Sequence, residues 1–190
     1  MRKLLALAAL VAGVVLAPSP AQAVDPNATP EPVVVYPMAP NNARGTVVKV
    51  QLEAPRGVWG LRTFVRQVDR EFKGLDVRLN GTCAQRPNRV CVRVFKGAYD
   101  EAQQLAITGG LFAGFYAVTT YPAAGERHIY LNTSLTPTNA HAVAVHEFGH
   151  VLGLNHHAKP GICGGWPDRT TLSGWERRAL RPYYGGRLGR

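Results

Sequence analysis

The chain has 190 residues, enough for one domain of ordinary size with a buried core, and carries 22 basic and 12 acidic residues, formally +10. This excess would suit acidic substrates, anionic polymers or cell surfaces. No nucleic-acid-binding motif accompanies the charge, so we expect no nucleic-acid partner and attribute the charge mainly to solubility.

The chain begins with two basic residues, an apolar run from Leu4 to Leu16 and the small-residue stretch Ala21–Ala23. This pattern is typical of a secretory signal peptide over residues 1–23, and its removal leaves 20 basic and 12 acidic residues, a net +8. The apolar run is too short for a stable anchor, and no later stretch is long enough to span a bilayer. We therefore expect a secreted, extracellular protein with no membrane contact after signal cleavage; an uncleaved anchor is the alternative.

The next stretch shows little periodicity. Residues 24–45 are rich in proline, asparagine and alanine, which predicts an extended N-terminal segment instead of a folded prodomain. The run Val33–Tyr36 would dock only as an edge strand, because prolines flank it. We place the folded domain at residues 46–190.

The folded domain opens with strand and helix patterns. Apolar side chains recur at helical spacing over residues 58–72, which predicts an amphipathic helix that ends near Gly74. Alternating, β-branched and aromatic residues predict five strands: Thr46–Leu52, Leu75–Leu79, Val90–Phe95, Phe115–Tyr121 and His128–Asn132.

Capping residues predict two further helices. Thr136 can cap a helix and Pro137 suits its first position. Ser173, with Glu176 three residues later, forms a capping box that opens the last helix. We expect the buried side of that helix to consist of Leu172, Trp175, Ala179 and Leu180.

The chain has three cysteines, an odd number for an exported protein. Cys83 and Cys91 are expected to form a disulfide that closes a short loop between two strands. Cys163 would then be unpaired, or it could exchange into that bond.

The run from His146 to His156 carries the chemistry. On a helix, His146 and His150 project from the same face, which lets both imidazoles bind one zinc ion. Glu147 is displaced around the helix, so it can face a water without binding the metal. Gly153 tolerates the left-handed backbone that ends a helix, and the turn would bring His156 back as a third ligand.

Three neutral nitrogens leave the fourth tetrahedral position of zinc open, as in catalytic sites. The alternative is an amphipathic helix whose histidines merely face solvent or the edge of the core. The five residues at fixed offsets argue against this alternative. His157 could be the third ligand instead, although the spacing favours His156. His128 and His141 are expected to be surface or structural residues.

The spacing H-E-x-x-H-x-x-G-x-x-H over residues 146–156 resembles that of the metzincin zinc proteases, and the chain is similar to matrixins and to small secreted bacterial neutral proteases. The resemblance is specific from about residue 128 to residue 184. It implies an α/β (α+β) zincin catalytic domain: a mixed, twisted five-stranded sheet, an active-site helix and a C-terminal helix. It also implies that Phe115–Tyr121 is an exposed edge strand with which an extended substrate pairs.

The resemblance implies a secreted zinc endopeptidase that acts as a monomer on protein or peptide substrates. Zn²⁺ held by His146, His150 and His156 would lower the pKa of a bound water and polarise the substrate carbonyl. Glu147 would act as the general base and then protonate the leaving amine. The alternative is a catalytically weak or inactive zinc-binding cationic module that binds an extracellular polymer or partner.

The chain departs from the metzincin pattern after the third histidine. Metzincins place a methionine in a tight turn below the metal, but the methionines here are Met1 and Met38. Cys163 is our candidate for the Met-turn substitute, because a buried cysteine is small and apolar; a disulfide or a metal contact is the alternative. Tyr183 and Tyr184 either reach the site, as a tyrosine does in some metzincins, or pack in the core after the last helix.

Overall fold

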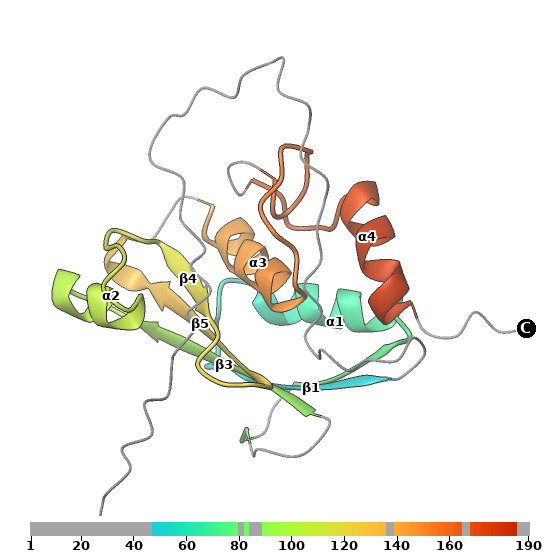
Figure 1. Ribbon diagram of the computed structural model, residues 1–190, viewed down its shortest axis with the longest axis horizontal. Coiled ribbons are helices and arrows are strands. Elements are labelled where there is room, and N and C mark those ends of the chain that lie inside the picture. The colour runs from blue at the N-terminus through green and yellow to red at the C-terminus, as the bar shows by residue number, and fades with distance from the viewer. Residues whose placement is uncertain (1–46, 80–81, 84–88, 136–138, 165–167, 186–190) are drawn as a thin grey trace, which may run out of the picture.

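The structure is a computed structural model of the chain and describes residues 47–79, 82–83, 89–135, 139–164 and 168–185 (Figure 1). Its elements, in chain order, are β1 (Val48–Glu53), α1 (Leu61–Glu71), β2 (Leu75–Leu79), β3 (Arg89–Gly97), α2 (Glu101–Ile107), β4 (Ala117–Thr120), β5 (Glu126–Asn132), the 3-10 turn η1 (Thr133–Leu135), α3 (Ala140–Val151) and α4 (Gly174–Tyr184). Within these residues, no helix is long and apolar enough to cross a membrane.

The five strands form one mixed sheet in the order β2-β1-β3-β5-β4. The pairs β1/β2, β1/β3 and β3/β5 are parallel, whereas β4 runs antiparallel to β5 and forms an edge of the sheet. The expected fold class, an α/β fold with a mixed five-stranded sheet, is confirmed. The observed strands begin and end within a few residues of the predicted bounds. Hydrophobic patterns are least informative about the ends of an element.

The core lies between the sheet and the helices α1, α3 and α4, which share one side of the sheet (Figure 1). Alternate strand residues point into this core, among them Val50, Val92 and Ile129. The ring of Phe64 on α1 meets that of Phe148 on α3 edge to face, with 6.2 Å between centroids. Helix α3 is apolar around nearly its whole circumference because it is covered on all sides, and this burial holds its histidines in place.

Helix α2 was not predicted from the sequence. Asp100 caps it, and Gln103 completes a capping box, but Gln104 is its one buried residue. Helix α2 has no apolar stripe, so it lacks the periodic pattern from which helices are predicted. Its capping box is nevertheless present in the sequence.

Helix α4 begins at the predicted capping box, yet its buried side differs from the expected one. Trp175 is 47% exposed and lies beneath the cationic groups of Lys159 and Arg178, at 3.8 and 4.3 Å from the ring centre. Glu176 is fully buried instead. The prediction that Trp175 is buried was wrong, because it rested on the apolar character of that side chain. It took no account of the hydrogen-bond donors with which the fold stabilises the buried carboxylate of Glu176.

Several predictions fall outside the described residues: the signal peptide, the extended segment 24–45, the strand Val33–Tyr36 and the cap at Thr136 and Pro137. Helix α3 itself begins at Ala140, with Asn139 at its N-cap and no capping bond from that side chain.

Candidate metal centre

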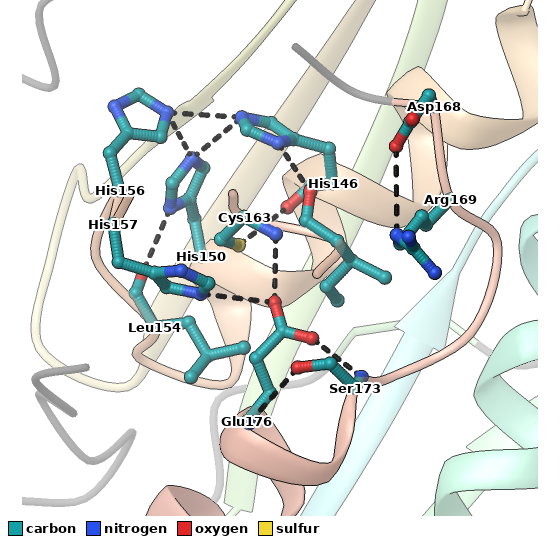
Figure 2. A network of polar contacts seen from close by, with 11 residues as sticks. His146, His150, Leu154, His156, His157, Cys163, Asp168, Arg169, Ser173 and Glu176 are labelled. Carbon is teal, nitrogen blue, oxygen red and sulfur yellow. Dashed lines mark hydrogen bonds and ion pairs between the residues drawn. The ribbon is translucent and has the colours of Figure 1, made fainter. Parts of the chain in front are cut away.

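Three imidazoles converge beside the C-terminal half of α3 (Figure 2). The Nε2 atoms of His146, His150 and His156 form a triangle in which all three separations are 3.1 Å. His146 and His150 are buried, and His156 is partly buried. Among the described residues, these three form the group of histidine, cysteine and acidic side chains whose ligand atoms all lie within 4.8 Å of one another.

The third histidine reaches the other two because α3 ends in a glycine turn. Gly153 has a φ of 92°, a left-handed value that side chains with a Cβ disfavour. The N–H of Gly153 donates to the His150 carbonyl at 2.9 Å, and the N–H of Leu154 donates to the Gly149 carbonyl at 3.0 Å. These two bonds form a Schellman motif, which reverses the chain and carries His156 back toward the helix.

Backbone carbonyls orient the first two imidazoles. His146 Nδ1 lies 2.7 Å from the carbonyl oxygen of Ile162, and His150 Nδ1 lies 2.8 Å from that of Leu154. A carbonyl only accepts hydrogen bonds, so Nδ1 donates in both neutral rings and Nε2 presents a lone pair. Lone pairs that face one another repel unless a cation lies among them.

This donor set fits Zn²⁺. Zinc binds imidazole nitrogen at about 2.0–2.1 Å in tetrahedral geometry, which separates its nitrogen ligands by about 3.3 Å. The 3.1 Å triangle is close to that spacing. The carbonyl bonds to Nδ1 are the outer support that a metal-binding histidine ordinarily has.

Burial makes the three imidazoles weak bases. It lowers the pKa of His146 and of His150, and the neighbouring imidazoles lower that of His146 further. The pKa of His156 falls to about 4, first through burial and then through His150 and His157. All three rings are therefore neutral at pH 7, which is the form that binds a metal ion.

Glu147 is buried on the side of α3 that faces strand β4. The Thr119 hydroxyl lies 2.6 Å from Glu147 Oε2 and 3.0 Å from the main-chain oxygen of the same residue. Burial raises the pKa of Glu147 to about 7, and the hydrogen bonds with Thr119 limit the rise. A carboxyl group that titrates near neutrality is suited to accepting and releasing a proton.

A tight turn lies below the three histidines in the stretch where the sequence lacks a methionine. The N–H of Gly164 donates to the Gly161 carbonyl at 3.3 Å and closes the turn, which presents the Ile162 carbonyl to His146. Cys163 is a free, buried thiol whose pKa is raised by burial, and its Sγ lies 3.6 Å from the His146 carbonyl oxygen. A Cβ at Gly149 would lie 2.4 Å from that sulfur, so the thiol packs directly against the helix.

A buried contact between a histidine and a carboxylate, which the sequence did not predict, ties this turn to α4 (Figure 2). His157 Nε2 lies 3.2 Å from Glu176 Oε1, and neither side chain is exposed. The same carboxylate accepts the N–H of Cys163 at 2.9 Å and that of Ser173 at 2.8 Å. Burial would raise the pKa of Glu176, but these hydrogen bonds outweigh it and lower the pKa. His157 is thus occupied by Glu176 and is not part of the triangle.

The remaining candidate residues lie away from the three histidines. His128 is on β5 against the ring of Phe95, and the ring of His141 packs on Gly60. Tyr184 is buried and donates its hydroxyl to the Leu152 carbonyl at 2.9 Å, which is the core role considered for it. Tyr183 is 38% exposed.

One further side chain supports the end of α3 and was not predicted. The Tyr121 hydroxyl donates to the His150 carbonyl at 3.1 Å, and burial raises the pKa of this tyrosine to about 12. It therefore stays protonated and acts as a donor at any physiological pH.

Cys83 and Cys91 form a disulfide, with their Cα atoms 5.5 Å apart. Cys91 lies on β3, and the N–H of Cys83 donates to the carboxylate of Glu53 at the end of β1, at 2.9 Å. The bridge thus anchors the described residues 82–83 to strand β3 of the sheet.

The mixed sheet with its antiparallel edge strand, the helix with two histidines and the returning third histidine are consistent with a metzincin catalytic domain. Comparison with known proteins narrows this class. Residues 95–163, from β3 through the turn at Cys163, match the family model described as matrixin. Human matrix metalloproteinase-25 is 34% identical over 92 residues, which cover 40% of this chain and 16% of the human protein.

Over the matched residues the chain is therefore similar to matrixins, and both comparisons point to the metalloprotease class. The chain spans less than a fifth of the length of the human relative. The matched family region contains β4, β5, α3, all three histidines and Cys163, but neither α1 nor α4.

Proposed function

We propose that the chain is a secreted zinc-dependent endopeptidase in which His146, His150 and His156 hold the metal and Glu147 is the general base. The observation that carries this proposal is the triangle of three neutral Nε2 atoms, each 3.1 Å from the other two, with a buried carboxyl group next to His146 in the chain. When bound, Zn²⁺ would supply Lewis acidity, which polarises a carbonyl and makes water more acidic.

The chain's own residues supply the proton transfers. Glu147 accepts a proton from the attacking water as a C–O bond forms at the substrate carbonyl. The same carboxyl then gives that proton to the amide nitrogen as the C–N bond breaks, which leaves a carboxyl and an amine as products. His157 and Glu176 support the surrounding structure and take no part in the proton transfers of this scheme.

The edge strand β4 supports an extended peptide as substrate. A peptide that pairs with an open edge is bound through its main chain, so affinity depends little on its sequence. We accordingly propose protein or peptide substrates in extended or unfolded form, cleaved by a monomer. The disulfide between Cys83 and Cys91 supports an oxidising, extracellular location, together with the signal peptide expected over residues 1–23.

The experiment that tests this proposal is cleavage of an unfolded protein by the mature chain, beside Glu147→Gln and a chelator-treated sample. We expect turnover to fall by about 10²-fold or more in Glu147→Gln while one zinc per chain stays bound, because this residue is not a ligand. His156→Gln should lose zinc, and His128→Gln is the matched control that should keep both zinc and activity.

No cleavage from a folded sample with one zinc per chain would overturn the proposal and favour the cationic binding module. Cleavage that survives complete zinc removal, with metal content measured on the same sample, would also contradict it.

A further inference from the structure

We propose that Thr119 is a positioning residue for Glu147: its hydroxyl holds the carboxyl group while its main chain forms part of the substrate-binding edge. This inference rests on the proposed function. Both side chains are buried, with 4% of Thr119 and 6% of Glu147 exposed, and their oxygens are 2.6 Å apart. A contact this short between two buried polar groups fixes the carboxyl group more firmly than solvent could.

The bonding capacity of a hydroxyl suits a carboxyl group whose protonation changes during a reaction. A hydroxyl has one proton to donate and lone pairs to accept with. It can donate to Glu147 Oε2 when that group is a carboxylate. When the group is a carboxylic acid, the hydroxyl can accept from it and donate instead to the Glu147 main-chain oxygen, 3.0 Å away. The same contact thus holds both forms that a general base passes through.

The register of β4 gives Thr119 its second role. In an antiparallel pair, residues alternate between hydrogen-bonded and non-hydrogen-bonded positions. The N–H of Asn132 donates to the Tyr116 carbonyl, which makes this pair a hydrogen-bonded one. Ala117 opposite Leu131 and Thr119 opposite Ile129 are then non-hydrogen-bonded pairs.

It follows that the N–H and C=O groups of Ala117 and Thr119 point away from β5, toward the open edge of the described sheet. A peptide added to this edge would bond to the main chain of Thr119, whose side chain bonds to Glu147. Thr119 therefore links the strand that binds substrate to the residue that moves the proton.

Steady-state cleavage by three variants tests this proposal, with zinc content measured for each. Thr119→Val keeps the shape but removes the hydroxyl, and we expect kcat to fall about 10- to 100-fold with KM changed less than about twofold, because positioning is lost and main-chain binding is kept. Thr119→Ser restores a hydroxyl and should stay within about threefold of the unsubstituted chain. Thr63→Val is the matched control: it makes the same change at an exposed position on α1, outside the substrate-binding edge and the three histidines, and should leave kcat unchanged.

A kcat for Thr119→Val within about threefold of the unsubstituted value would overturn the proposal, as would a Thr119→Ser enzyme as impaired as the valine variant. If Thr119→Val does not fold, Thr119→Ala compared with Thr119→Ser decides the same question. Zinc stoichiometry should stay at one per chain in every variant, because Thr119 is not one of the three proposed ligands.

A double-mutant cycle separates this proposal from the proposed function. Urea unfolding of Thr119→Val, Glu147→Ala and the double variant measures the contact without any turnover. We expect the double variant to shift the urea midpoint by less than the two single shifts combined. Additive shifts would show that Thr119 and Glu147 do not stabilise each other, which would overturn the proposed contact. Coupled shifts in a chain that cleaves no substrate would keep the contact but overturn the proposed function, and with it the role of Thr119 in catalysis.

Discussion

Gly149 shows how closely single residues are matched around the three histidines. It lies where α3 passes over the turn at Cys163, and the helix comes so close to the sulfur that no side chain fits between them. Cys163 packs against α3 at this point, with its Sγ 3.6 Å from the His146 carbonyl oxygen. Its role as the Met-turn substitute stays a prediction, and the packing against Gly149 is the physical basis on which we maintain it.

Gly149→Ala is expected to destabilise the fold by about 1–3 kcal/mol, because its Cβ would lie 2.4 Å from Cys163 Sγ and 2.9 Å from Ile162 Cδ1. Urea unfolding measures this loss. Adding Cys163→Ala should restore part of the stability, since it removes the closest atom. Gly174→Ala is the matched control: a Cβ there meets nothing nearer than 3.8 Å, so that variant should be neutral or slightly stabilised. Equal effects at both glycines would contradict the packing argument.

Glu176→Gln is expected to destabilise the chain by about 1–3 kcal/mol, because it disrupts a buried carboxylate that contacts His157 and accepts hydrogen bonds from Cys163 and Ser173. The glutamine amide would also turn a donor toward the N–H of Cys163 or of Ser173. Thermal or urea unfolding checks this value. Asp168→Asn breaks an exposed ion pair with Arg169 and should change stability by less than about 1 kcal/mol. A loss at Glu176 no larger than this control would show that the pair is not structurally important.

At the scale of elements, the site depends on how α3 ends and on what supports its last turn. The Schellman motif at Gly153 sets the direction of the chain that carries His156. Two tyrosine hydroxyls support the same turn. That of Tyr121 donates to the His150 carbonyl, and that of Tyr184 donates to the Leu152 carbonyl. The end of α3 is therefore held by Tyr121, which follows β4, and by Tyr184 on α4. These contacts keep His156 within reach of His146 and His150.

Gly153→Ala is expected to cost about 1–2 kcal/mol of stability, because alanine disfavours a left-handed φ. We also expect weaker zinc binding, since the strain is relieved by moving the segment that carries His156. Competition with a chromophoric chelator measures the affinity. Gly153→Asn should lose less than the alanine variant, because asparagine tolerates this conformation better. An unchanged affinity in Gly153→Ala would show that the turn does not position His156.

At the scale of the whole molecule, three histidines with lowered pKa values and one glutamate with a raised pKa are buried together. The unfolded chain binds protons on these histidines below pH of about 6.5, whereas the metal-free folded chain does not. Glu147 acts in the opposite sense: its folded pKa of about 7 favours the folded state at low pH. Three groups outweigh one, so proton uptake on unfolding dominates between about pH 5 and pH 7.

The metal-free chain is therefore expected to be more stable at pH 7 than at pH 5, because stability rises with pH wherever the unfolded state binds more protons. Urea midpoints at both values, with chelator present, check the sign. His156→Gln should reduce the difference, since it removes one of the three histidines. A metal-free chain that is more stable at pH 5 would contradict the burial of neutral imidazoles.

Local patterns in the sequence predicted much of the molecule. The five strands, the helices α1, α3 and α4 and the group of three histidines follow from hydrophobic periodicity, capping residues and the four-residue spacing of His146 and His150. These signals act within one or two helical turns, so the sequence alone determined them. The glycine turn at Gly153 belongs to the same kind, because its left-handed backbone requires no distant partner.

The tertiary structure alone decided which polar groups meet inside the fold. Thr119 and Glu147 are 28 residues apart, and His157 and Glu176 are 19 residues apart. A buried carboxylate is stable only where several donors from separate segments converge, and no local pattern encodes that convergence. For the same reason the sequence suggested a buried Trp175, whereas the fold supplies partners to the carboxylate of Glu176 and buries that residue instead.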